Sequence, residues 1–151
     1  MNWQQWHSRG DLKPHRTSKP ELDNMRALIA RDLADAAISA LSEDRRFATA
    51  YNAALQSGTM AIACSGYRVA ARAGHHKITF DAAAFAIGTT AIPFARYFDT
   101  CRRKRNVIDY MNASVATQSE ADELLAKCIA FNALVEQWLA ANYPALAPRL
   151  R

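Results

Sequence analysis

Residues 18–40, SKPELDNMRALIARDLADAAISA, decide the fold class of this chain. The segment opens with Ser18 in a position to cap a helix, Pro20 in the first turn, and Glu21 at the third helical position. Apolar residues then recur every three or four positions, which is the spacing of one helix face; they are Leu22, Met25, Ile29, Leu33, Ala36, Ala37 and Ala40. The segment therefore predicts an amphipathic helix that packs against other helices.

A second helix is predicted from about residue 42 to 65, where Gly66 can adopt the left-handed C-cap conformation. Its inward line consists of Phe47, Tyr51, Ala54, Leu55, Gly58 and Ile62. Gly58 costs about 1 kcal/mol relative to alanine inside a helix. We therefore expect a neighbouring helix to approach closely at this position. Tyr51 is expected in the core with its hydroxyl hydrogen-bonded.

Three more helices follow along the chain. Thr79 can cap a short helix that stops at Gly88, and a longer helix is predicted from about 90 to 111. A last helix is predicted between Ser119, as its cap, and Pro144. Its apolar face consists of Leu124, Cys128, Phe131, Val135, Trp138 and Leu139.

The pattern as a whole predicts an all-α protein, an up-and-down antiparallel bundle of four to five helices. Period-two runs of β-branched or aromatic residues are absent, so no strand is expected. We expect residues 1–17 to form an irregular basic arm, 18–144 the bundle and 145–151 a short tail. Residues 67–78 are expected to form a loop.

The composition narrows the class of protein. The chain has 151 residues, enough for one domain with an ordinary core. No apolar run reaches the ~18 residues of a membrane span, so no membrane association is expected. Cys64, Cys101 and Cys128 lack CxxC spacing, which predicts buried thiols without a disulfide framework or zinc site, in a cytoplasmic protein. Neither a metal nor a cofactor is expected, since Walker, GxSxG, HExxH and GxGxxG motifs are absent.

The net charge of +5 is concentrated in a few segments. Its densest part is the run Arg102-Arg103-Lys104-Arg105. At about 100° per residue, Arg105 falls on the apolar stripe of its helix, while Arg102, Asn106 and Asp109 follow one margin. Arg103 and Lys104 are expected to face solvent.

Two interpretations of this margin remain open. In the first, Arg105 forms a structural salt bridge with Asp109, helped by Arg102, because a buried unpaired guanidinium is costly. In the second, Arg102, Arg105, Asn106, Asp109 and Tyr110 form a margin that binds phosphate or cleaves RNA.

The segment from Arg102 to Tyr110, RRKRNVIDY, resembles the late-helix signature of HEPN domains, in which an Arg-rich turn precedes a polar residue and a tyrosine. Shorter stretches fit the same family, and together they cover about residues 20–140; they are RDLADA from Arg31, AYNAA from Ala50, SGYR from Ser65 and GHH from Gly74. The resemblance implies a dimeric helical bundle. Family members often act beside a small nucleotidyltransferase in toxin–antitoxin or defence systems, and many are metal-independent ribonucleases.

The chain departs from the ribonuclease pattern at one position. Ribonuclease members carry Arg, usually a polar residue, and then His four to six residues later, where the histidine acts as acid or base. Arg105 and Asn106 match the first half, but Tyr110 stands at the expected histidine, and tyrosine is a poor base at neutral pH. The resemblance thus implies binding of RNA or nucleotide in an Arg-rich dimer cleft that lacks the histidine of the ribonuclease members. The alternative is a non-catalytic module that partners a nucleotidyltransferase, for which Tyr110 is a candidate modification site.

Histidines and tryptophans outside this motif leave further alternatives. His75 or His76 could approach the Arg-rich margin and replace the absent histidine, or both could form an exposed loop pair or a helix cap. His76 is therefore a candidate binding residue for RNA or nucleotide. Trp3 and Trp6 could stack on bases or pack on the bundle or a second subunit.

Overall fold

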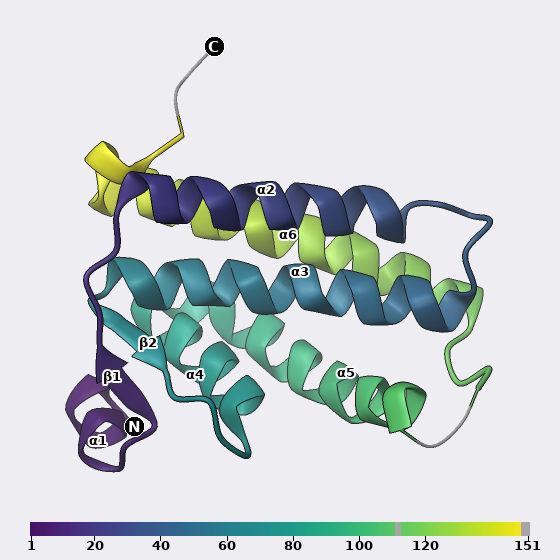
Figure 1. The fold of residues 1–151 in the computed structure, drawn as a ribbon, viewed down its shortest axis with the longest axis horizontal. Coiled ribbons are helices and arrows are strands. Elements are labelled where there is room, and N and C mark those ends of the chain that lie inside the picture. Colours follow the sequence, from purple (N-terminus) through teal and green to yellow (C-terminus); the bar gives the residue numbers. More distant parts are fainter. Residues whose placement is uncertain (111–112, 149–151) are drawn as a thin grey trace.

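The computed structural model describes residues 1–110 and 113–148; the side chains of Asp109 and Tyr110 lie outside this description. The all-α prediction is confirmed: six α-helices and two short 3-10 helices dominate the described chain, beside one two-stranded sheet (Figure 1). The elements in chain order are α1 Trp3–Ser8, β1 Leu12–Pro14, α2 Lys19–Ala36, α3 Glu43–Cys64, β2 Tyr67–Val69, α4 His75–Ile87, η1 Thr89–Ala91, α5 Ile92–Tyr110, α6 Gln118–Asn142 and η2 Pro144–Leu146.

Side-chain caps start three of the long helices. The Ser18 hydroxyl accepts from the Glu21 backbone N–H at 3.3 Å before α2, and Ser42 caps α3 in the same way. The observed cap of the last helix lies two residues before the predicted one. Thr117 caps it in a full capping box with Glu120, whereas Ser119 lies inside the first turn. The prediction of Ser119 was wrong because Thr117 and Glu120 satisfy two backbone N–H groups together.

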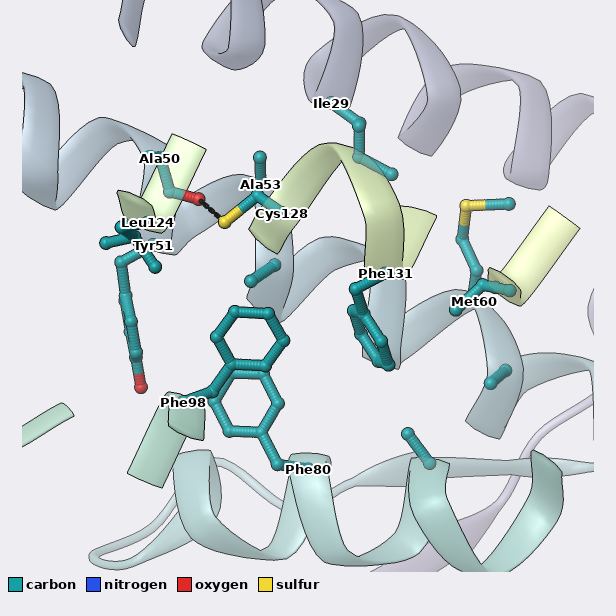
Figure 2. Close-up of a cluster of buried hydrophobic side chains, with 14 of the residues drawn as sticks. Ile29, Ala50, Tyr51, Ala53, Met60, Phe80, Phe98, Leu124, Cys128 and Phe131 are labelled. Atoms are coloured by element: carbon teal, nitrogen blue, oxygen red, sulfur yellow. Dashed lines mark hydrogen bonds between the residues drawn. The ribbon is translucent and has the colours of Figure 1, made fainter. Parts of the chain in front are cut away.

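Helix α3 is the central helix, packed against α2, α4, α5 and α6 (Figure 1). Aromatic and apolar side chains from these helices meet along it (Figure 2). The Phe98 ring of α5 lies 5.1 Å from Phe80 of α4 and 5.2 Å from Phe131 of α6, centroid to centroid. The Cys128 thiol donates to the Ala50 carbonyl at 3.1 Å, and all three cysteines are buried, as predicted.

The close approach predicted at Gly58 is confirmed. A Cβ built there would lie 3.2 Å from Cγ2 of Thr79 and 3.6 Å from Cβ of Ala83, both on α4. Glycine thus lets α4 pack directly on the α3 backbone, and this contact positions the N-terminal turn of α4.

The prediction of an irregular arm over residues 1–17 was wrong. Asn2 and Gln5 form a capping box that starts α1, and Trp6 is buried. Strand β1 then pairs antiparallel with β2, with Leu12 opposite Val69, so the expectation of no strand was also wrong. Trp3 stacks on Tyr67 with ring centroids 5.3 Å apart, which shows that the tryptophans pack on the bundle.

Residues 67–78 are more ordered than predicted. The first three form β2, and α4 begins at His75, four residues before the expected cap. Gly74, with φ +82°, occupies the N-cap position and carries no side chain to mark a helix start. Thr79 lies one turn inside α4, where its hydroxyl donates to the His75 carbonyl at 2.8 Å. The predicted end of this helix at Gly88 is confirmed.

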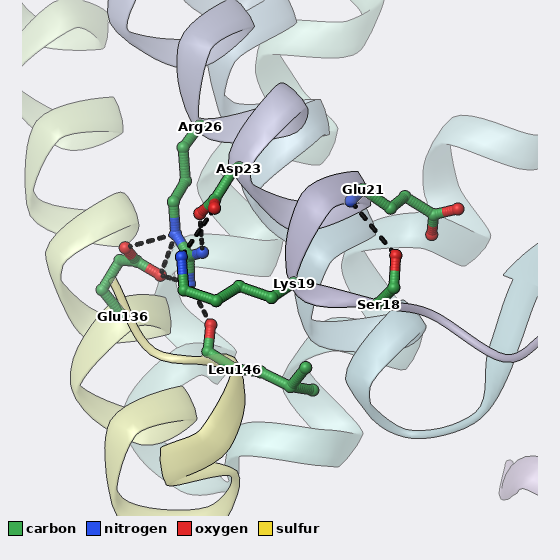
Figure 3. Close-up of polar contacts among 7 residues, drawn as sticks. All are labelled: Ser18, Lys19, Glu21, Asp23, Arg26, Glu136 and Leu146. Carbon is green, nitrogen blue, oxygen red and sulfur yellow. Dashed lines mark hydrogen bonds and ion pairs between the residues drawn. The ribbon is translucent and has the colours of Figure 1, made fainter. Parts of the chain in front are cut away.

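A polar cluster fixes the chain after α6 (Figure 3). Arg26 of α2 forms ion pairs with Asp23 at 2.7 Å and Glu136 at 3.0 Å, and donates to the Leu146 carbonyl at 2.8 Å. The segment expected as a tail therefore begins as part of the bundle.

By length and composition, α6 is the one helix of the described chain that could cross a membrane. One of its faces, from Leu124 to Leu139, is buried in the core. The core helix of a soluble bundle passes the same test, so this is weak evidence for a membrane span.

Candidate functional site

A cleft of about 520 Å³ opens between the start of α4 and the second half of α5. It is lined by residues 71–76 from the α4 side and by Arg102, Arg105 and Asn106 from the α5 side. The structure thus brings together four predicted site residues, His76 and these three. The side chains of the other two, Asp109 and Tyr110, lie outside the described part of the chain, so the predicted Arg105–Asp109 salt bridge falls outside it as well.

Helix geometry directs the two cleft arginines of α5. Phe98 and Cys101 face the core, and Arg102 and Arg105 follow them along the margin that faces α4. Nε of Arg102 donates to Asp99 at 3.0 Å, and both side chains are about one-quarter exposed. The guanidinium carbon of Arg105 lies 5.7 Å from the centroid of the Tyr51 ring, within the range of a cation–π contact.

His76 provides the titratable group of the cleft. Its Nδ1 lies 3.1 Å from the hydroxyl of Tyr51, a fully buried residue of α3, whose hydroxyl is hydrogen-bonded as predicted. Burial, together with the nearby His75, Arg105 and Arg102, lowers the pKa of His76 to about 4. Burial also raises the pKa of Tyr51. Both groups are therefore neutral at pH 7.

The tautomer of His76 sets its role toward a ligand. If the Tyr51 hydroxyl donates to Nδ1, Nε2 carries the proton and is a hydrogen-bond donor; if Nδ1 donates to the hydroxyl, Nε2 is a base. Sequence reasoning placed His76 in a loop that could swing toward α5. The structure instead fixes it in the first turn of α4, between Tyr51 and the arginines.

The backbone at the start of α4 adds to the site. Gly74 forms no side-chain cap, so the first N–H groups of this 13-residue helix have no side-chain partner at the N-cap. Helix N-termini favour anions because these N–H groups and the helix dipole point toward them. His75 belongs to the same turn, with its Nδ1 2.7 Å from the Arg72 carbonyl.

Sequence reasoning missed one cation of the cleft, Arg72, together with its partner. Arg72 pairs with Asp11 at 2.9 Å and also donates to the Gly10 carbonyl. Asp11 is only 3 % exposed and also lies 3.4 Å from Nε of Arg9. No local pattern marks this pair, since the pairing of β1 with β2 brings the two residues together.

Two bases of the Arg-rich run lie outside the cleft. Arg103 is exposed, as predicted. Lys104, which was also expected to face solvent, pairs with Glu120 at the start of α6. Glu120 also forms the capping box with Thr117, which holds its carboxylate at the start of α6.

The arrangement suits an anion better than a metal ion. The guanidinium groups of Arg102 and Arg105 and the start of α4 offer N–H donors to phosphate oxygens in the cleft, and His76 adds another donor in the tautomer that carries its proton on Nε2. In the described part of the chain, no three His, Cys, Asp or Glu side chains are grouped as metal ligands would be. Burial raises the pKa of Cys64 and of Cys101 to about 11, which keeps both thiols protonated.

No protein-family model, curated protein or solved structure matches this chain.

Proposed function

We propose that this protein binds a phosphate-bearing ligand, RNA or nucleotide, in the cleft between α4 and α5. The observation that carries the proposal is the convergence of Arg102, Arg105 and His76 with the uncapped start of α4. The cleft volume of about 520 Å³ falls within the usual range of ligand sites. Arginine forks match phosphate oxygens in geometry as well as charge.

Metal-independent RNA cleavage is a second candidate, because a histidine does face the arginines. In the tautomer whose Nδ1 donates to Tyr51, Nε2 of His76 would take the 2′-hydroxyl proton as that oxygen attacks the adjacent phosphorus. The P–O5′ bond breaks to leave a 2′,3′-cyclic phosphate, and the leaving 5′-oxygen takes a proton from water. Arg102 or Arg105 would stabilise the negative charge that develops on the phosphate. Intact labelled RNA after incubation with the wild-type protein would count against this candidate without affecting the binding proposal.

The wider assignment is also a proposal. A cytoplasmic, dimeric HEPN-like protein of a toxin–antitoxin or defence system would bring two such clefts together and double the local positive charge. The competing proposal is a non-catalytic module for a nucleotidyltransferase partner. Copurification with the product of a neighbouring gene, without RNA, would favour the module.

The binding proposal is tested with fluorescence anisotropy of a labelled single-stranded RNA. We expect the double variant Arg102→Ala, Arg105→Ala to lose at least 100-fold in affinity. The slope of log K against the logarithm of the salt concentration should become shallower by about two, because two phosphate contacts are lost. Arg103→Ala is the matched control, because it removes one charge from the same run on the exposed face. Circular dichroism must show the same helicity in all three proteins.

If Arg103→Ala lost as much RNA affinity as Arg102→Ala or Arg105→Ala alone, binding would depend only on the net charge of the protein, and the proposal would be wrong. Unchanged affinity in the double variant would also contradict the proposal. Mononucleotide and inorganic pyrophosphate, used as competitors, distinguish a nucleotide from a bare phosphate as the preferred ligand.

A further inference from the structure

A second depression, here called the aromatic groove, adjoins the phosphate cleft between α1, α4 and α5. Its volume is about 390 Å³. Arg102 lines the cleft, while Asp99, its ion-pair partner at 3.0 Å, lines the groove. On α4, His76 lines the cleft and the next residue, Lys77, lines the groove. The two depressions are therefore neighbours along the same pair of helices.

The aromatic groove gathers large apolar side chains that stay exposed. Met1 is 54 %, Phe85 47 % and Ile92 38 % exposed, and all three line it. The Phe85 ring is held edge-on by Trp3 and Trp6, with centroids 5.5 and 5.7 Å away. The groove thus presents an aromatic ring that is accessible and fixed in place.

Two cationic side chains, Lys77 and Arg96, also line the groove. Arg96 lines the groove and is exposed, and its guanidinium has no ion pair within the described chain. Lys77 pairs with Asp81 at 3.0 Å on the opposite side. Asp81 and Asp99 also line the groove, so Arg96 is the lining cation without a carboxylate partner in the described residues. Proteins bind single-stranded nucleic acid with aromatic rings that stack on bases and with cations beside them that contact phosphates.

We propose that the aromatic groove takes the bases of a single-stranded nucleic acid whose phosphate lies in the cleft. His76 and Phe85 are nine residues apart, about 14 Å along the axis of α4, and their side chains point about 180° apart around the helix. A ligand that reaches both must cross from one face of α4 to the other, which is farther than a mononucleotide extends. The inference rests on the proposed function and makes its ligand a short strand.

The test compares two probes, a labelled ten-nucleotide oligouridine and inorganic pyrophosphate, on five variants, one of which is Arg102→Ala. Phe85→Ala should weaken oligouridine binding at least 10-fold and change pyrophosphate binding less than twofold. Phe85→Leu, which keeps an apolar side chain without a ring, should behave like Phe85→Ala, and Phe85→Trp should bind like the wild type. Ile129→Ala, which alters an equally exposed apolar residue on α6, is the control and should change neither affinity.

The outcomes separate the two proposals. If Phe85→Ala and Phe85→Leu bind oligouridine like Ile129→Ala, while Arg102→Ala still weakens both probes, the groove inference is wrong and the phosphate cleft stands. If Arg102→Ala changes neither probe, the cleft proposal itself fails. If Phe85→Ala instead dissociates a dimer in analytical ultracentrifugation and leaves oligouridine affinity intact, the groove is covered by a second copy, which also overturns the inference.

Discussion

The protonation of His76 leads to a prediction about stability and pH. The pKa of this imidazole is about 4 in the folded protein, against an ordinary value of 6.5. Between these values the unfolded chain binds a proton that the folded protein does not. Stability therefore rises with pH from about 4 to 6.5, and is lost as the pH falls through that window. We expect His76→Gln to remove this contribution, because glutamine can still hydrogen-bond to Tyr51 and does not titrate.

The magnitude follows from the two pKa values. For a fully buried group with these two pKa values, the free energy of unfolding falls by about 2 kcal/mol as the pH is lowered from 7.5 to 5.0. His76 is only half-buried, and solvent screening reduces the expected effect to about 1 kcal/mol.

The assay is urea unfolding of both proteins at half-unit pH steps from 7.5 to 5.0, without ligand. The wild type should lose about 1 kcal/mol more than His76→Gln over this range. All other titrating groups are the same in the two proteins, so the difference between their pH profiles reports on His76. Parallel pH profiles would refute the argument that the cleft holds His76 neutral.

Three further perturbations test the fold and the cleft. Gly58→Val should destabilise the protein by about 1–3 kcal/mol in urea unfolding, because its side chain would collide with α4; wild-type stability would show that the two helices can separate at low cost. Asp11→Asn should raise phosphate affinity a few-fold in the anisotropy assay, because it frees Arg72 from its ion pair; unchanged affinity would place Arg72 beyond reach of the ligand. Thr117→Ala should cost about 1 kcal/mol and Ser119→Ala almost nothing, and equal unfolding midpoints would contradict the observed cap.

Long helices with capping residues and periodic apolar positions were predictable from the sequence. Ser18 and Ser42 start α2 and α3 where expected, and Gly66 and Gly88 end α3 and α4 with positive φ. These signals act within a few residues of each other, so a local pattern is enough to identify them.

Elements that depend on distant contacts were missed. Strand β1 includes Lys13 and Pro14 and shows no alternation, so only its pairing with residues 67–69 makes it a strand. Gly74 starts α4 without a capping side chain, which displaced the expected start to Thr79.

In the candidate site, too, residues that share one helix were predictable, and residues that meet through distant contacts were not. The helical wheel placed Arg105 on the apolar stripe and Arg102 and Asn106 on the margin beside it, because all three lie on a single helix. The ion pair between Arg72 and Asp11 was not predictable, because the two residues are far apart in sequence and meet through the small sheet.

The small sheet also sets how the site can open. Residues 1–14 are held to the bundle by a three-residue strand, the Asp11 ion pairs and the packing of two tryptophans, far less than holds α3. Local unfolding of this segment, with the four long helices intact, would release Arg72 and withdraw Met1 and Trp6 together. Amide hydrogen exchange should therefore be faster in residues 1–14 than in α3, and slow when nucleic acid is bound. Unfolding of residues 1–14 would therefore remove two residues of the groove lining, Met1 and Trp6, while the cleft would keep all of its lining residues and gain an Arg72 that is free of Asp11.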